Sequence, residues 1–217
     1  MKHLVIIGAG GFGREVLSWA RQSVAQGSEW IVRGFIDDNP DAPGIVGLDV
    51  PLLGGVRDYK PAPDDVFTCA IGGVEVKRRC IEAVRAAGGV FVPVIHRSVV
   101  IGERVSVGEG VILCPGVILC PDARLGDFVT VNLHSTIAHD CRVGDWTQIH
   151  CHVDVTGSVK IGARVTIGSH ASLLPGVAVG DRAIIGAGAV VNRDIEPDVT
   201  AVGVPAKVIK HHGAATS

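Results

Sequence analysis

Among the side chains able to carry out acid–base chemistry, His139 stands out because Asp140 follows it directly. Imidazole titrates near neutral pH, and a neighbouring carboxylate can orient the ring and favour its charged form. Such a pair can accept the proton that an amine or a hydroxyl loses as it attacks an activated carbonyl carbon. Taken alone, however, a solvated His–Asp dipeptide in a turn is the simpler interpretation.

A glycine-rich segment near the start of the chain is the second candidate for chemistry. It runs Gly8-Ala9-Gly10-Gly11-Phe12-Gly13 and follows the apolar run Leu4–Ile7. Glycines permit a tight turn from a strand into a helix, where bare N–H groups attract phosphate. Asp37, followed by Asp38, lies where an acidic residue could hold a ribose hydroxyl. A tight turn without any ligand is the competing interpretation.

The first 95 residues alternate predicted strands and helices. We expect strands at Leu4–Ile7, Ile31–Ile36, Val66–Ile71 and Val90–Ile95, with helices after Gly13 and over Val74–Ala87. This alternation predicts a parallel sheet in an α/β domain over residues 1–95, about half of a full dinucleotide fold. Because the half that would hold a nicotinamide is missing, we rank a nucleotide-linked sugar above NAD as its ligand. An NAD-dependent redox enzyme remains an alternative.

The rest of the chain is dominated by aliphatic residues at a strict six-residue spacing. They are Ile101, Val107, Leu113, Leu119, Leu125, Val131, Ile137, Val143, Ile149, Val155, Ile161, Ile167, Leu173, Val179, Ile185 and Val191. A short fixed period indicates a solenoid of stacked coils. Small or β-branched residues recur four positions later, so two positions in six point inward. Three short strands then close one triangular coil of about eighteen residues, and coils stack about 4.8 Å apart.

This pattern resembles the hexapeptide-repeat family, and the resemblance implies an all-β, left-handed parallel β-helix over residues 96–192. A turn-rich extension follows over residues 193–217, with a tail from His211 to Ser217 that we expect to be disordered. The fold class predicted for the whole chain is therefore an α/β half-Rossmann domain followed by a left-handed β-helix.

Composition excludes several other classes of protein. The net charge of −2 argues against a nucleic-acid groove. Leu4–Ile7 is too short to span a bilayer, and no signal-peptide pattern is present, so we expect a cytoplasmic protein without membrane contact. The six cysteines form no CxxC pair and suit a reducing compartment.

The glycine-rich domain, the solenoid, the His139-Asp140 pair and the terminal segment Gly203–Lys207 occur together in this order. The arrangement resembles the bacterial sugar acetyltransferases related to the sialic acid O-acetyltransferases. The resemblance implies transfer of an acetyl group from acetyl-CoA, as co-substrate, to the amine of a nucleotide-linked amino sugar. It also implies a homotrimer, a role in surface polysaccharide biosynthesis and no metal. The alternatives are O-acetylation of a sugar or sialic acid, and a non-catalytic nucleotide-binding scaffold.

The resemblance also implies roles for individual residues. His139 would be the general base, beside Asp140, and Gly157, eighteen residues later, would lie over it and donate its N–H to an oxyanion. Asn132 would contact the acceptor sugar. The residues expected to bind the nucleotide-linked sugar are Gly8, Gly10, Gly11, Phe12, Gly13, Asp37, Asp38, Lys77, Asn132 and Gln148. Those expected to bind CoA are Gly157, Gly186, Gly188 and Lys207.

Three of these positions depart from the family pattern. Phe12 and Gln148 stand where well-known aminosugar members have histidines, and Lys77 occupies a place often held by arginine. The departures concern the identity of the sugar and the nucleotide more than the acyl transfer.

Three further histidines, His134, His152 and His170, are spaced by eighteen and should form a vertical ladder. The pair His134 and His139 has the His-x4-His spacing of the gamma-class carbonic anhydrases, a related solenoid family of metalloenzymes. Ser98 stands where the third metal ligand would be. We therefore expect a stacked surface ladder near an interface rather than a metal site.

Overall fold

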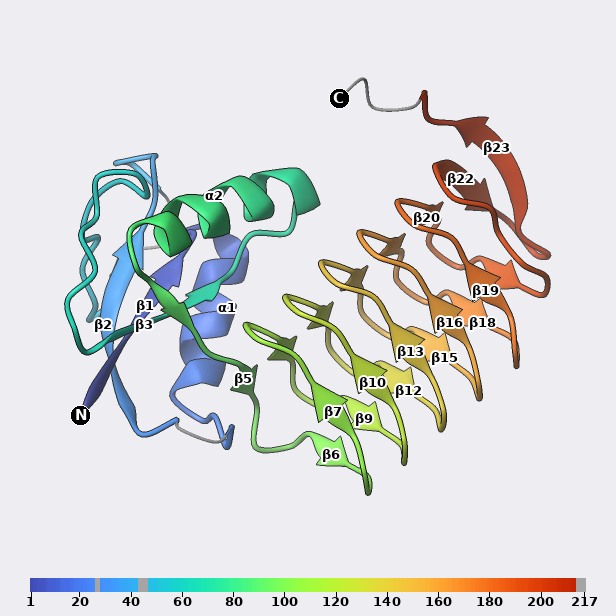
Figure 1. The fold of residues 1–217 in the computed structure, drawn as a ribbon, viewed down its shortest axis with the longest axis horizontal. Coiled ribbons are helices and arrows are strands. Elements are labelled where there is room, and N and C mark those ends of the chain that lie inside the picture. Colours follow the sequence, from blue (N-terminus) through green and yellow to red (C-terminus); the bar gives the residue numbers. More distant parts are fainter. Residues whose placement is uncertain (26–27, 43–46, 214–217) are drawn as a thin grey trace. The chain divides into compact units, whose positions relative to one another are not determined.

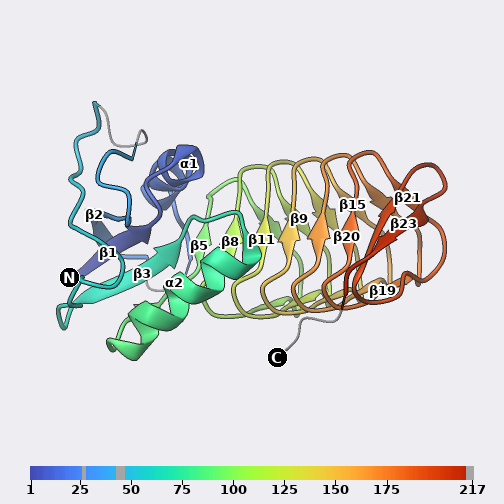
Figure 2. The same cartoon turned by 90° about the horizontal axis from the view of Figure 1, so that it is seen from above.

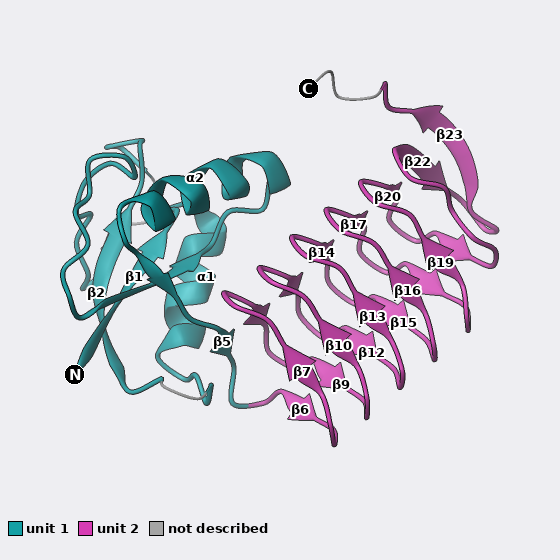
Figure 3. Cartoon of the chain, viewed as in Figure 1, with its two compact units in different colours: residues 1–97 teal, residues 98–217 magenta. Residues whose placement is uncertain are grey.

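The computed structural model describes residues 1–25, 28–42 and 47–213. The chain divides into two compact units, residues 1–97 and 98–217 (Figure 3). The second unit includes the residues that the sequence had set apart as an extension from 193 onward. Neither helix in the described residues is long and apolar enough to cross a membrane.

The first unit is an α/β domain, as expected (Figure 1). Its elements are β1 (Lys2–Ile7), α1 (Gly11–Ala20), β2 (Trp30–Ile36), β3 (Asp65–Cys69), α2 (Val74–Ala86), β4 (Val90–Phe91) and β5 (Val94–Ile95). Four strands form a parallel sheet in the order β2-β1-β3-β4. The single strand expected over Val90–Ile95 is instead two short ones, separated by Val92 and by Pro93, which has no N–H to donate.

The two helices pack on opposite faces of this sheet (Figure 2). Helix α1 buries Val16 and Leu17, and α2 buries Ile81 and Val84, so each helix turns one apolar stripe to the sheet. The connection from β1 runs to β2 on one side, whereas the connection from β3 runs to β4 on the other. The point of divergence, at the carboxyl ends of β1 and β3, is where open α/β sheets bind ligands.

The second unit is a solenoid whose short strands form three sheets. The first sheet contains β8 (Ile112–Leu113), β11 (Thr130–Val131), β14 (Gln148–Ile149), β17 (Thr166–Ile167), β20 (Ile184–Ile185), β22 (Val199–Val202) and β23 (Lys207–His211). The second contains β6 (Val100–Ile101), β9 (Ile118–Leu119), β12 (Thr136–Ile137), β15 (Asp154–Val155), β18 (Ser172–Leu173) and β21 (Val190–Val191). The third contains β7 (Ser106–Val107), β10 (Arg124–Leu125), β13 (Arg142–Val143), β16 (Lys160–Ile161) and β19 (Ala178–Val179).

Successive strands of each sheet are parallel, and paired residues are eighteen apart, as in Thr136 with Asp154. We call the turn after each strand of the first sheet the first corner, and the turn after each strand of the second sheet the second corner. The parallel strands of three stacked sheets fit the predicted left-handed β-helix.

The aliphatic column forms the core of the solenoid. Its members are buried from Leu113 to Val191, whereas Ile101 is 46% exposed. The difference arises because the first coil has a neighbouring coil on only one side. Polar residues that point inward are satisfied by backbone carbonyls of the next coil: Ser135 Oγ donates to His150 O at 2.7 Å, and Thr147 Oγ1 to Gly162 O at 2.9 Å.

The last strands complete the solenoid rather than trailing from it. Strand β22 pairs in parallel with β20, and β23 returns antiparallel to β22. The expectation of disorder from His211 was wrong at its start, because His211 ends β23 and His212 donates its N–H to Asp198 O at 2.7 Å. The remainder of that predicted tail, residues 214–217, lies outside the described residues.

Candidate active site

His139 and Asp140 lie at the second corner, between β12 and β13. Their side chains are in contact, with 2.8 Å between His139 Nδ1 and Asp140 Oδ2, and both are more than half exposed. Asp140 adopts a left-handed backbone conformation, with φ of 61°, as do Asp122 and Ser158 at equivalent places in adjacent coils. Because a carboxylate accepts hydrogen bonds, a proton on Nδ1 serves this contact and leaves Nε2 of a neutral ring as the proton acceptor.

Gly157 lies against the other nitrogen of the same ring. A β-carbon built on Gly157 would lie 2.7 Å from His139 Nε2 and 2.8 Å from Cε1. The glycine is not required by its own backbone, because the positive φ at this corner belongs to the next residue, Ser158. It is required by the ring, since any side chain here would displace the imidazole.

The N–H of Gly157 forms no backbone hydrogen bond with the part of the chain that the structure describes. The equivalent places one coil before His139 and one coil after Gly157 are Pro121 and Pro175, which have no N–H at all. The solenoid therefore does not use a donor at this position. The donor remains available beside Nε2 of His139.

Two other predicted residues lie away from this corner. Asn132 is at the first corner, half-buried, and its Oδ1 accepts a bond from Cys114 Sγ at 3.5 Å. Gln148 is buried in β14 of the first sheet, and its Nε2 finds no hydrogen-bond partner among the described residues. Within one chain, neither residue lies at the corner that carries His139.

The glycines expected to bind CoA lie at two different corners of the solenoid. Gly186 and Gly188 are at the first corner, whereas Gly157 is at the second. A β-carbon on Gly186 would lie 2.6 Å from Val202 Cγ1, but one on Gly188 would meet nothing within 4 Å. Lys207 is exposed at the start of β23, opposite Val202.

In the first unit, the glycines of the glycine-rich loop, Gly8–Gly13, have different structural roles. Gly13 is structural, because a β-carbon there would lie 2.1 Å from the carbonyl oxygen of Gly8, which itself has φ of 97°. Gly10 and Gly11 have open space around the β-carbon position, so their backbone is accessible at the start of α1. Phe12 packs edge-on against Trp19 of its own helix, with ring centroids 5.9 Å apart.

Asp37 and Asp38 directly follow β2 beside this loop, and their carboxylates accept hydrogen bonds from backbone N–H groups. Asp37 Oδ2 accepts from Ala9 N–H at 2.7 Å, and Oδ1 accepts from Asn39 N–H at 2.8 Å. Asp38 Oδ1 accepts from Val56 N–H at 2.8 Å. Asp37 therefore fixes the glycine-rich loop to the end of β2, while the second oxygen of Asp38 has no bond to a described backbone donor.

Asp38 also lines a pocket of about 190 Å³ with Arg57, Arg79 and Cys80. The two arginines were missed by sequence reasoning, because Arg57 lies in a loop without a motif and Arg79 is one of several cations on α2. Lys77, predicted to bind the sugar, is completely buried on α2 and is not among the residues lining this pocket.

Three of the cysteine thiols, those of Cys69, Cys80 and Cys141, are not activated. Burial raises the pKa of Cys69 to about 12, although the Lys77 ammonium acts in the opposite direction. Burial also raises the pKa of Cys80, where the Asp38 charge adds to it, and the pKa of Cys141. These three thiols stay protonated near neutral pH and are poor nucleophiles.

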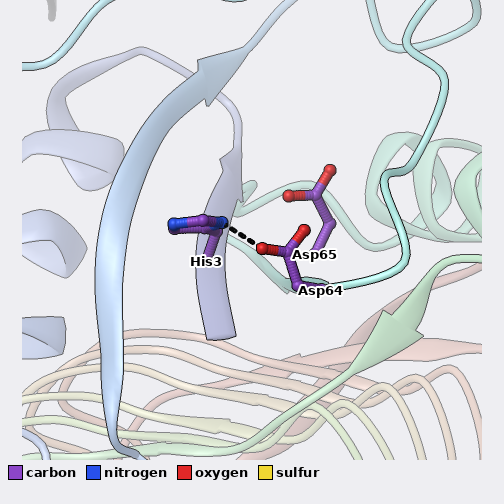
Figure 4. A group of neighbouring side chains, drawn as sticks. All are labelled: His3, Asp64 and Asp65. Atoms are coloured by element: carbon purple, nitrogen blue, oxygen red, sulfur yellow. Dashed lines mark ion pairs between the residues drawn. The ribbon is translucent and has the colours of Figure 1, made fainter. Parts of the chain in front are cut away.

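Within the described residues, one group of side chains has the donor atoms to hold a metal: His3, Asp64 and Asp65, at the amino ends of β1 and β3 (Figure 4). His3 Nδ1 is 2.7 Å from Asp64 Oδ2. Arg33 already contacts this group, with one guanidinium nitrogen 2.8 Å from Asp65 Oδ1 and the other 2.7 Å from His3 Nδ1. Tyr59 donates to Asp65 Oδ2 at 2.7 Å. The guanidinium occupies the place that a cation would take, so we regard the group as a structural charge network.

Comparisons with known proteins agree with this architecture. Residues 3–84 match the model of the PglD N-terminal domain, and residues 158–193 match that of the bacterial transferase hexapeptide (six repeats). A comparison with curated proteins returns no match to this chain.

Solved structures resemble the chain over almost its entire length. PerB from Caulobacter crescentus, crystallised with CoA and GDP-perosamine, is 31% identical, with a TM-score of 0.85 over 97% of this chain and 98% of that chain. WeeI from Acinetobacter baumannii AYE is 29% identical, with a TM-score of 0.83 over 96% and 100%. The acetyltransferase domain of PglB from Neisseria gonorrhoeae FA1090, in complex with acetyl coenzyme A, is 28% identical, with a TM-score of 0.84 over 96% and 99%.

These similarities confirm the predicted fold and the predicted enzyme class, a CoA-dependent sugar acyltransferase with acetyl-CoA as co-substrate. This chain belongs to the sugar acetyltransferases of the hexapeptide-repeat family.

Proposed function

We propose that the protein transfers the acetyl group of acetyl-CoA to the amine of a nucleotide-linked amino sugar, with His139 as general base. The observation that carries the proposal is the setting of the His139 ring. Its Nδ1 contacts Asp140, and its Nε2 lies against the backbone of Gly157, whose N–H is not used by the solenoid.

In this mechanism the amine nitrogen attacks the thioester carbonyl carbon while Nε2 of His139 takes the proton that the amine loses. Asp140 holds the ring through Nδ1 and favours the imidazolium that forms. The carbonyl oxygen becomes an oxyanion, and the unused N–H of Gly157 can donate a hydrogen bond that stabilises it. As the tetrahedral intermediate collapses, the C–S bond breaks, and the imidazolium can return the proton to the CoA thiolate. No acyl-enzyme is needed, which agrees with the raised pKa of Cys141 at the same corner.

The first unit is proposed to hold the nucleotide part of the acceptor. Gly10 and Gly11 leave backbone N–H groups accessible at the start of α1, a common setting for phosphate. Asp38, with Arg57 and Arg79, lines the pocket beside the carboxyl end of β2. The neighbour PerB was crystallised with CoA and a nucleotide sugar, GDP-perosamine, which supports an acceptor of this class.

We further propose a homotrimer in which neighbouring solenoids complete each site. The positions of Asn132 and Gln148 support this, because neither shares a corner with His139 within one chain. Gln148 also keeps an unsatisfied buried amide, Nε2, among the described residues. We also propose that the enzyme acts in the cytoplasm, where acetyl-CoA is available, and modifies sugars for surface polysaccharides.

The decisive experiment incubates the purified protein with acetyl-CoA and a panel of nucleotide-linked amino sugars, and follows the release of the CoA thiol. Matched acceptors in which a hydroxyl replaces the amine separate N-acetylation from O-acetylation. We expect release only with an amino sugar, together with a mass increase of one acetyl group on the acceptor. Release with the hydroxyl acceptors alone would replace the proposal by O-acetylation, and release with none would favour a nucleotide-binding scaffold.

A further inference from the structure

The three histidines of the first corner form a stacked ladder of exposed imidazoles. Ring centroids of His134 and His152 are 5.4 Å apart, and those of His152 and His170 are 4.9 Å apart. Interplanar angles of 12° and 5° make the rings nearly parallel. Each histidine has a positive φ between 55° and 61°, so one backbone geometry repeats from coil to coil.

The two ends of this ladder differ. We call the His134 end of the ladder, nearer the N-terminus, its lower end. There, a β-carbon on Gly116 would lie 2.4 Å from His134 Nδ1, so the ring of His134 lies over the glycine of the preceding coil. The backbone of Gly116 therefore covers the lower face of the ladder. Gly116 is itself fixed, because its N–H donates to Ser98 Oγ at 3.0 Å.

At the upper end, beyond His170, the equivalent position of the next coil is Gly188, which contributes no ring. Its N–H donates to Ser169 O at 2.9 Å, which repeats the bond from His170 N–H to Cys151 O at 3.0 Å. Its φ is 69°, close to that of the three histidines. A β-carbon there would meet nothing within 4 Å. The place of a fourth ring, one spacing above His170, is thus left free.

We propose that the free face of His170 is a stacking platform for the adenine ring of CoA, which occupies the place where Gly188 has no side chain. The inference rests on the proposed function, in which acetyl-CoA is the donor. Aromatic side chains, histidine included, bind nucleobases by stacking on their π faces. A glycine rung gives a base the room that a fourth imidazole would take.

A cation for the CoA phosphates lies close to the platform in the fold. The exposed Lys207 pairs with Val202, and Val202 packs against Gly186, two residues from Gly188. The bond from Ala206 N–H to Val190 O, at 2.8 Å, fixes the segment that carries Lys207 over the same coil. A planar ring surface, with a lysine carried over the same coil, suits an adenosine phosphate.

Isothermal titration of the whole protein with CoA, and with 4′-phosphopantetheine as the matched ligand without adenosine, tests the platform. In His170→Ala we expect the Kd for CoA to rise about 5- to 150-fold, the usual worth of one stacked base. Gly188→His should weaken CoA binding similarly by filling the place with a fourth imidazole, and the column already accommodates histidine at this φ in three coils. Both variants should bind 4′-phosphopantetheine like the unaltered protein.

His134→Ala is the matched control, since it removes an identical side chain from the covered end of the same ladder. We expect its Kd for CoA to stay within about twofold of the unaltered value. The platform would be overturned by unchanged CoA binding in His170→Ala, by an equal loss in His134→Ala, or by an equal loss for 4′-phosphopantetheine. Failure of the unaltered protein to bind CoA at all would instead overturn the proposed function, together with this inference.

Discussion

The imidazole of His139 and the backbone of Gly157 are in direct contact across one coil of the solenoid, with 2.7 Å between Nε2 and the position that a β-carbon of Gly157 would take. The carboxylate of Asp140 contacts Nδ1 of the ring, and the backbone of Gly157 lies against Nε2. This relationship places the proposed proton acceptor beside an unused N–H donor, and it underlies the first two predictions.

His139→Asn should lower turnover by roughly 10²- to 10⁴-fold, the usual contribution of a general base. The side chain is 64% exposed, so the melting temperature and the Kd for CoA should change little. Steady-state thiol-release assays and calorimetry check both parts. Turnover close to that of the unaltered protein would remove His139 from the mechanism.

Gly157→Ala should reduce turnover strongly while leaving the fold intact. The added methyl group meets the ring of His139 rather than backbone of the next coil, so an exposed ring moves and the base loses its position. Ser158→Ala is the control, because the next residue at this corner already carries a β-carbon. Equal turnover in both variants would show that the contact between Gly157 and His139 does not matter for the reaction.

Gly13→Ala and Gly10→Ala should have different effects in the first unit. A methyl group on Gly13 collides with the carbonyl oxygen of Gly8, so overpacking should cost about 1–3 kcal/mol of unfolding free energy. A methyl group on Gly10 meets nothing within 4 Å, so stability should hold while nucleotide-sugar binding weakens. Thermal melts and ligand titration distinguish the two effects. Equal loss of stability in both variants would contradict the distinction.

Val155→Asp should unfold much of the solenoid. Val155 is 1% exposed within the aliphatic column, and a carboxylate there has no partner, which costs several kcal/mol or forces protonation. Because coils are stabilised by their neighbours, the damage should spread along the stack and dissolve any oligomer. Lys160→Asp introduces the same carboxylate on the outer face of β16 and should be tolerated. Size-exclusion chromatography and melting curves provide the comparison.

The repeat made most of the solenoid predictable from the sequence. One inward aliphatic residue every six positions determines both the strands and the eighteen-residue register, because the strands of each coil pair with those of the neighbouring coils. The family resemblance singled out His139, Asp140 and Gly157, and the periodicity placed Gly157 one coil after His139, so their contact follows from local rules. The alternation of strands and helices in the first unit was equally plain.

Burial and the choice of partners were decided by the tertiary structure. Lys77 and Gln148 resemble exposed polar residues in the sequence, yet both are buried, because long-range packing and not residue type determines exposure. Contacts between atoms distant in sequence decided three further features. They are the different roles of Gly10 and Gly13, the bond between Asp37 and the glycine-rich loop, and the free space at Gly188. A periodic pattern specifies which residues share a column, whereas free space around a residue depends on everything that packs near it.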